Sequence, residues 1–219
     1  MAWPRRYAAY LFDLDGTLVD TAPDLNAALN QTLVSAGLAP VDEALTRHWV
    51  GHGARAMLAQ ALANAGATGH DEAALLEQFL ATYATGLSRL SRIYPTVTAT
   101  LERLRADGAR TAVVTNKPAA LAEPLLNELG MGPLFDLIVG GDTAARPKPA
   151  ADPIDWCLRR LDVMPQDTLF VGDSETDVLA ARAAAIDVVC VPYGYNHGVD
   201  VATLNPDGII ASFAELAAH

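Results

Sequence analysis

Residues 7–20 read YAAYLFDLDGTLVD, and this stretch decides the fold. Its first six residues form a short apolar run rich in aromatic side chains, which favours a strand buried on both faces of a parallel sheet. Gly16 supplies the chain reversal after that strand. Asp13 and Asp15 are therefore predicted at the carboxyl end of the strand, the edge of an open α/β sheet where ligands bind. We interpret them as a nucleophile beside its proton donor.

The segment after this strand has a helical pattern. Asp20 or Thr21 can cap a helix with Pro23 in its first turn, and apolar residues mark one face of it up to Gly37. Further helical patterns follow over residues 43–49, 54–64 and 71–90. Because these patterns contain no convincing strand, residues 18–91 are predicted to form an all-helical insert with its linkers.

From residue 94 onward, short β-rich runs alternate with helical segments, as is typical of a parallel sheet flanked by helices. Strands are predicted over residues 110–115, 137–139, 168–171 and 187–191, with a short edge strand at 208–210. Helices are predicted over residues 97–107, 118–129, 152–161 and 174–185, with a last one after Ser212. The first strand must join this sheet, because a lone strand cannot bury itself. The predicted fold is α/β: a Rossmann-like, doubly wound parallel sheet of residues 1–17 and 92–219, with residues 18–91 inserted as a helical cap.

Composition narrows the classes of function. The chain has 219 residues, 51% of them hydrophobic, and a formal net charge of −11, which argues against nucleic acid or an anionic membrane surface as a partner. Cys157 and Cys190 are too few for a disulfide framework or a zinc site, so a cytoplasmic location is expected. No segment approaches the ~20 apolar residues of a membrane span. The oligomeric state stays open.

Polar residues recur where the predicted strands end. Parallel strands bring these ends together at one edge of the sheet. That edge would collect a nucleophilic carboxylate, an acid, a hydroxyl and amide pair, an ammonium group and a further carboxylate, a set that suits phosphoryl transfer. The residues concerned are Asp13, Asp15, Thr115, Asn116, Lys148 and Asp173.

These residues also have purely structural interpretations. Thr115 and Asn116 could end a strand and cap the following helix. Lys148 could be a surface charge, and Asp173 could be a helix cap. Their joint occurrence at strand ends favours the functional interpretation.

Several segments match one family of enzymes, in that family's order: residues 13–20 (DLDGTLVD), 114–118 (VTNKP), 140–143 (GGDT), 148–149 (KP), 171–174 (VGDS) with Asp177, and 193–196 (YGYN). Through them the chain resembles the haloacid dehalogenase superfamily of phosphatases over nearly its whole length, and within it the phosphoglycolate phosphatases. The resemblance implies a Mg²⁺-dependent phosphomonoester hydrolase that converts 2-phosphoglycolate to glycolate and phosphate. Thr96 departs from the family pattern, which usually has glycine after Tyr-Pro.

The resemblance also implies roles for the acidic residues. Asp13 would attack phosphorus and form an aspartyl-phosphate, while Asp15 would act as acid and then as base. Mg²⁺ would be bound by the Asp13 carboxylate, the Asp15 backbone carbonyl and the Asp173 carboxylate. Asp177 would order the waters of the metal.

Phosphate-binding and cap residues follow from the same resemblance. Thr115 and Asn116 would donate to phosphate oxygens, and Lys148 would pair with the phosphate and with Asp13. Residues 51–55 resemble the cap loop that faces the site. The candidate anchors for a substrate carboxylate are Arg47, His52 and Arg55, whose alternative is a solvated surface position.

Other functions share parts of this pattern. A sugar-phosphate phosphatase or phosphomutase of the same superfamily would have the same core and differ in its cap. A phosphoacceptor signalling domain also places aspartates, a hydroxyl and a lysine on a doubly wound sheet, but its chain would be shorter and lack the helical insert.

Overall fold

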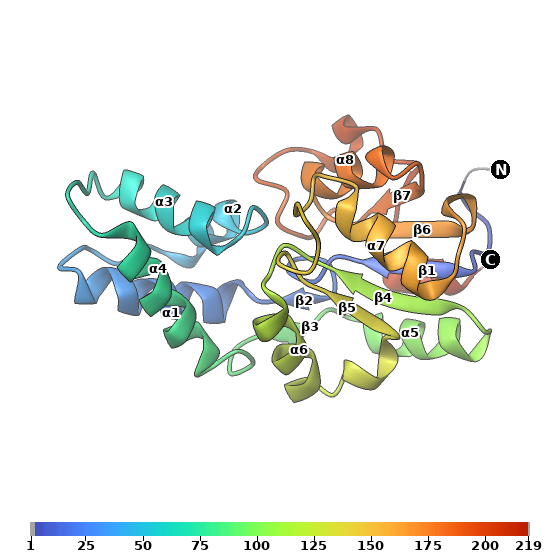
Figure 1. The fold of residues 1–219 in the computed structure, drawn as a ribbon, viewed down its shortest axis with the longest axis horizontal. Helices are drawn as coiled ribbons and strands as arrows, with labels where there is room; N and C mark the ends of the chain where they lie inside the picture. Colours follow the sequence, from blue (N-terminus) through green and yellow to red (C-terminus); the bar gives the residue numbers. More distant parts are fainter. Residues whose placement is uncertain (1–2, 219) are drawn as a thin grey trace.

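The computed structural model describes residues 3–218, and within them six parallel strands form one sheet with the order β5-β4-β1-β6-β7-β8 (Figure 1). The strands are β1 (Ala9–Phe12), β4 (Arg110–Val114), β5 (Leu137–Val139), β6 (Thr168–Gly172), β7 (Asp187–Cys190) and β8 (Gly208–Ile209). The first strand lies inside the sheet, paired with β4 on one side and β6 on the other. Its carboxyl end is therefore flanked by those of two other strands. The predicted α/β fold is confirmed, and β8 is the predicted edge strand.

Helices cover both faces of this sheet. Tyr10 and Phe12 point into a cluster with α5 (Val97–Ala106), α6 (Ala119–Glu128) and the 3-10 helix η4 (Phe213–Ala217). Ala9 and Leu11 point into a cluster on the other face, with α7 (Asp152–Leu161) and α8 (Glu175–Ala183). All four β1 side chains are buried, which explains why the sequence of this strand is apolar at every position. The shorter 3-10 helices are η1 (Gly132–Leu134), η2 (Pro165–Asp167) and η3 (Val201–Leu204).

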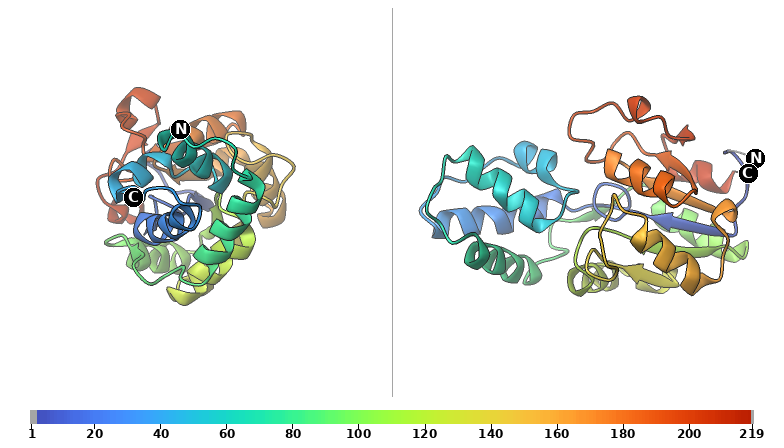
Figure 2. Two further views of the ribbon diagram at one scale, coloured as in Figure 1. Left: turned by 90° about the vertical axis from the view of Figure 1, so that its left-hand side faces the viewer. Right: turned by 45° about the horizontal axis from the view of Figure 1, so that its top comes forward.

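The helices of the N-terminal third lie beside the sheet and do not cover either of its faces (Figures 1 and 2). They are α1 (Ala22–Ser35), α2 (Glu43–Trp49), α3 (Ala54–Asn64) and α4 (Glu72–Ala84), and we refer to them as the helical unit. Buried side chains such as Leu29, Leu33 and Phe79 form its interior. Helix α4 is shorter than the helical pattern over residues 71–90 predicted. It ends at Ala84, two residues before Gly86.

The two linkers between the helical unit and the sheet form a structure that the sequence analysis missed. Strand β2 (Val19–Asp20) pairs antiparallel with β3 (Arg92–Ile93), so the insert is not entirely helical. Two residues are too few to show the alternation by which a strand is predicted.

The Asp24 carboxylate, in the first turn of α1, accepts hydrogen bonds from the backbone N–H groups of Leu90 and Ser91 and from the Ser91 hydroxyl.

Thr96, which precedes α5, has a φ of 65°. This left-handed conformation is rare for a β-branched residue and easy for glycine. The departure from the family pattern therefore falls where the backbone favours glycine.

Candidate active site

The carboxyl ends of β1, β4 and β6 meet at the edge of the sheet that faces the helical unit (Figure 1). Asp13 follows β1, and its backbone N–H donates to Val171 O over 2.9 Å. Thr115 follows β4 in the same way, with its N–H 2.9 Å from Val139 O. Asp173 follows β6, and the side chains of Asp13, Thr115 and Asp173 are buried. Residues distant in the sequence thus meet at the predicted edge.

Lys148, from the loop after β5, lies between two carboxylates. Its Nζ is 2.9 Å from Asp13 Oδ1 and 2.6 Å from Asp177 Oδ1, and it lies over the ring of Phe170. Burial alone would lower the pKa of Lys148, but the carboxylates of Asp13 and Asp177 raise it to about 12. Lys148 is only 3% exposed, which rules out the surface position considered from the sequence.

Asp177 holds the loop that carries Asp173. Its Oδ2 accepts hydrogen bonds from the backbone N–H groups of Asp173 and Ser174 and from the Ser174 hydroxyl. With Oδ1 paired to Lys148, both Asp177 oxygens are occupied. The residue that caps α8 is Ser174 and not Asp173, so the capping alternative for Asp173 does not hold.

The Asp173 carboxylate is enclosed by the loop after β1 and by the loop after β7. Thr17 Oγ1 donates to Asp173 Oδ1 over 2.9 Å, and the Tyr195 backbone N–H donates to Oδ2. A Cβ atom on Gly16 or Gly194 would collide with that same Oδ2. Glycine is required at both positions because the backbone approaches the carboxylate closely.

Asp15 faces the helical unit and has a partner that the sequence analysis did not select. Its Oδ1 accepts from the Thr21 hydroxyl over 2.6 Å and lies 2.8 Å from Lys117 Nζ. Burial alone would lower the pKa of Lys117, but Asp15 and Tyr83 raise it above its usual range. The signal for Lys117 was present, since a lysine directly after Thr115 and Asn116 lies at the same strand end.

The geometry of the acidic residues suits a metal ion. Carboxylate oxygens of Asp13, Asp173 and Asp177 lie within 4.8 Å of one another. Asp177 Oδ1 is paired with Lys148 and its Oδ2 accepts three hydrogen bonds, whereas each Asp173 oxygen accepts one. Asp13 and Asp173 are therefore the better candidates for carboxylate ligands. Oxygen donors of this kind are the ligands of hard divalent cations.

The charge balance points the same way. Burial raises the pKa of Asp13 to about 6, against the opposing effect of the Lys148 ammonium, and burial with Asp177 raises the pKa of Asp173 well above its usual range. Among the described residues, the carboxyl groups at this edge outnumber the ammonium groups by two, which is the excess that a divalent cation would balance. The groups counted are Asp13, Asp15, Asp173 and Asp177 against Lys117 and Lys148.

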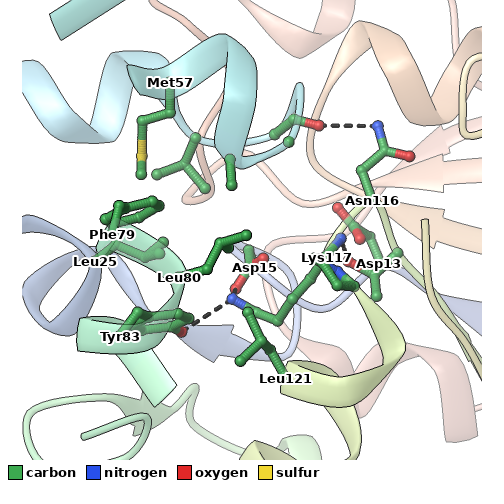
Figure 3. Close-up of a pocket in the computed structure, with 16 residues that line it drawn as sticks. Asp13, Asp15, Leu25, Met57, Phe79, Leu80, Tyr83, Asn116, Lys117 and Leu121 are labelled. Atoms are coloured by element: carbon green, nitrogen blue, oxygen red, sulfur yellow. Dashed lines mark hydrogen bonds and ion pairs between the residues drawn. The ribbon is translucent and has the colours of Figure 1, made fainter. Parts of the chain in front are cut away.

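A pocket lies between this edge and the helical unit (Figure 3). Asp13, Asp15, Thr115, Asn116 and Lys117 line it from the sheet side. The remaining wall is mostly apolar and includes Leu25, Val50, Met57, Phe79, Leu80 and Leu121. The pocket can therefore hold a small ligand whose charged group lies at the end lined by Asp13 and Asp15.

Asn116 connects the two sides of the pocket. Its side-chain Nδ2 donates to Gly51 O of the helical unit over 3.1 Å and to Lys148 O over 3.0 Å. Both amide hydrogens are thus used within the protein, and Asn116 links the 51–55 loop to this edge of the sheet.

Residues 10–191 match the family model described as haloacid dehalogenase-like hydrolase. The chain belongs to this family. Within residues 3–218, no helix of this hydrolase has the length and apolar character needed to cross a membrane.

Two curated relatives and one solved structure similar to this chain are named as phosphoglycolate phosphatases. The hydrolase is 41% identical to the phosphoglycolate phosphatase of Colwellia psychrerythraea, over 94% of this chain and 93% of the relative. It is also 41% identical to phosphoglycolate phosphatase 1 of Pseudomonas aeruginosa, over 94% and 77% of the two chains. The crystal structure of a predicted phosphoglycolate phosphatase from Haemophilus somnus superposes with a TM-score of 0.91 at 35% identity, covering 97% of both chains. The resemblance noted from the sequence is confirmed, and the protein is a phosphatase.

The candidate carboxylate anchors of this hydrolase do not line the pocket. Arg47 Nη2 is 2.8 Å from Asp20 Oδ2 and 2.8 Å from Glu43 Oε1, so its charge is already paired. His52 stacks on His197 with ring centroids 4.5 Å apart, and Arg55 is exposed. Partial burial, together with His197, lowers the pKa of His52.

Proposed function

We propose that this hydrolase is a Mg²⁺-dependent phosphatase that converts 2-phosphoglycolate to glycolate and phosphate through an aspartyl-phosphate at Asp13. The observation that carries the proposal is the buried Asp13 carboxylate, held by Lys148 at 2.9 Å and facing Asp173 at the mouth of a small pocket. The phosphoglycolate phosphatase names of its relatives support the substrate.

In the first step, an Asp13 oxygen bonds to phosphorus while the bond from phosphorus to the glycolate oxygen breaks. Lys148 binds Asp13 Oδ1 and so fixes the orientation of the carboxylate. We assign the attack to the other oxygen. We assign three donors to the phosphate oxygens: the Thr115 hydroxyl, the backbone N–H of Asn116 and the Lys148 ammonium. The backbone of Asn116 takes this role because its side-chain amide already donates to Gly51 O and Lys148 O.

Asp15 moves the protons of both steps. In the first step it protonates the departing glycolate oxygen, and in the second it takes a proton from the water that attacks phosphorus and releases Asp13. Its Oδ1 is held by Thr21 and Lys117, which leaves Oδ2 for this exchange.

The residues that would hold Mg²⁺ are Asp13 and Asp173 through their carboxylates and Asp15 through its backbone carbonyl. Bound there, the ion would neutralise charge on the phosphate and on the attacking carboxylate. Asp177 positions the ligand loop through its bonds to the backbone of Asp173 and Ser174.

We further propose the domain division: residues 1–17 with 92–219 form the phosphatase core, and residues 18–91 form a cap that excludes bulk water. The pocket supports this division, since side chains from both parts line it. The hydrogen bond from Asn116 Nδ2 to Gly51 O also supports this division, because it connects the cap loop to the core.

The test is kcat/KM measured across a panel of phosphate esters at saturating Mg²⁺. We expect 2-phosphoglycolate to be the best substrate and chelation of the metal to abolish turnover. A clear preference for a sugar phosphate would favour the rival phosphatase or phosphomutase and overturn the substrate assignment. A stable phosphoprotein without ester turnover would instead indicate a phosphoacceptor domain.

A further inference from the structure

Lys117 is a buried cation in the pocket that the proposed reaction does not use. It follows β4, and its side chain is 4% exposed. Its Nζ lies 2.8 Å from Asp15 Oδ1 and 3.0 Å from the Tyr83 hydroxyl, on the side of Asp15 that faces α4 (Figure 3). Phosphate binding is assigned to Lys148, at the other end of the aspartate cluster.

The pocket around Lys117 offers no other cation among the described lining residues. Most of the side chains beyond it are apolar, including Met57, Phe79, Leu80 and Leu121. An apolar wall with one ammonium group favours a short ligand that carries a single negative charge at that point. Arg47 and Arg55 do not line this space.

Tyr83 adds a second donor at the same place. Its hydroxyl accepts the hydrogen bond from Lys117, so its own hydrogen is available to an incoming acceptor. Burial raises the pKa of Tyr83 to about 12, which keeps the phenol protonated at neutral pH. Lys117 comes from the core and Tyr83 from the helical unit, so a ligand held by both would connect the two parts.

We propose that Lys117 and the Tyr83 hydroxyl bind the carboxylate of the substrate and so select phosphate esters of 2-hydroxy acids. The inference rests on the proposed function. Asp15 protonates the oxygen that leaves phosphorus, and in 2-phosphoglycolate one carbon atom separates that oxygen from the carboxylate carbon. The carboxylate therefore reaches the neighbourhood of Asp15, where Lys117 Nζ lies. Phosphate esters without a carboxylate leave this ammonium without a partner from the substrate.

The test compares 2-phosphoglycolate with ethyl phosphate, in which a methyl group replaces the carboxylate. For the wild-type protein we expect kcat/KM to favour 2-phosphoglycolate. In Lys117→Met the ratio of the two kcat/KM values should fall by about 10- to 100-fold, as for loss of a charge-assisted hydrogen bond, with most of the change in KM. An equal loss on both esters would overturn the inference, because Lys117 would then act only through Asp15.

Two further variants keep the inference testable if Lys117→Met does not fold. Tyr83→Phe keeps the ring and should lower the same ratio by a smaller factor, while Lys117→Arg keeps the charge and should restore most of the preference lost in Lys117→Met. If Lys117→Met does not fold, an unchanged ratio in Tyr83→Phe overturns the inference. Wild-type hydrolysis of both esters without preference would reject the carboxylate site and leave the phosphatase standing, whereas no hydrolysis of either would reject the proposed function itself.

Discussion

Asp13 and Asp173 are buried carboxylates whose charge the protein alone does not balance. Lys148 pairs with Asp13, yet burial still raises the pKa of Asp13 to about 6. The desolvation of the carboxylate outweighs the attraction of the ammonium group in the metal-free protein. A cation bound between Asp13 and Asp173 would stabilise the ionised carboxylates and so lower their pKa values.

This imbalance predicts the pH dependence of stability. In metal-free protein, the folded state binds a proton at Asp13 more tightly than the unfolded state, whose pKa is 3.8. The free energy of unfolding should therefore fall as pH rises from about 4 through about 6, and the contribution of Asp13 to this fall is up to about 3 kcal/mol. Urea unfolding of the chelator-treated protein at a series of pH values measures this fall.

Two controls accompany that measurement. Asp13→Asn should remove the part of the loss that comes from Asp13 and leave the part that comes from Asp173, whose pKa is also raised. Saturating Mg²⁺ should suppress both parts, because the metal binds the ionised carboxylates. Stability of the metal-free protein that rises over this pH range would contradict the charge balance described for the site.

Residues at strand ends were predictable, whereas their partners were not. Asp13, Thr115 and Asp173 stand next to apolar runs, and the shared edge of parallel strands brings them together. Tyr83 lies within the helical pattern predicted for residues 71–90, and its contact with Lys117 joins positions 34 residues apart. Such a contact depends on how the helical unit meets the sheet, which no local pattern encodes.

At the level of elements, the Asp24 carboxylate joins α1 to the second linker, which leads from α4 back to the sheet. Asp24 is 4% exposed and accepts from Leu90 N, Ser91 N and the Ser91 hydroxyl. Tyr195 holds the start of α1, since its hydroxyl accepts from the N–H groups of Thr21 and Ala22. The first turn of α1 is thus capped from the core, and the Thr21 side chain is left to bind Asp15.

Asp24→Ala should therefore destabilise the protein by about 3 kcal/mol, because buried N–H donors lose a charged acceptor. Asp42→Ala is the matched control: Asp42 is an exposed N-cap that accepts from Leu45 N, and its loss should cost about 1 kcal/mol. Urea unfolding of both variants gives the comparison. A smaller loss for Asp24→Ala than for Asp42→Ala would show that the junction does not depend on this carboxylate.

The elements differed in how far the sequence predicted them. Helices α2, α3 and α7 begin and end where their patterns predicted, and strand β5 does as well. The last helix proved to be the 3-10 helix η4, although its capping box at Ser212 and Glu215 is present. The β2 and β3 strands were missed because each is short and is stabilised by a partner more than 70 residues away.

For the whole molecule, the sheet unit and the helical unit meet at one pocket, and each contributes to it. The sheet brings the charged groups, and the helical unit brings most of the apolar wall and Tyr83. The fold class could be predicted because the chain alternates strands and helices after residue 94. The match of 0.91 in TM-score to a structure of the same family agrees with that prediction.

The central claim is that phosphate is transferred to Asp13, and rapid acid quenching during turnover of substrate labelled with radioactive phosphate tests it most directly. The account predicts that the wild-type protein carries acid-stable label on the peptide containing Asp13, and that Asp13→Asn carries none and loses at least about 1,000-fold in kcat. Label on a different residue, or steady turnover of Asp13→Asn at the wild-type rate, would contradict it.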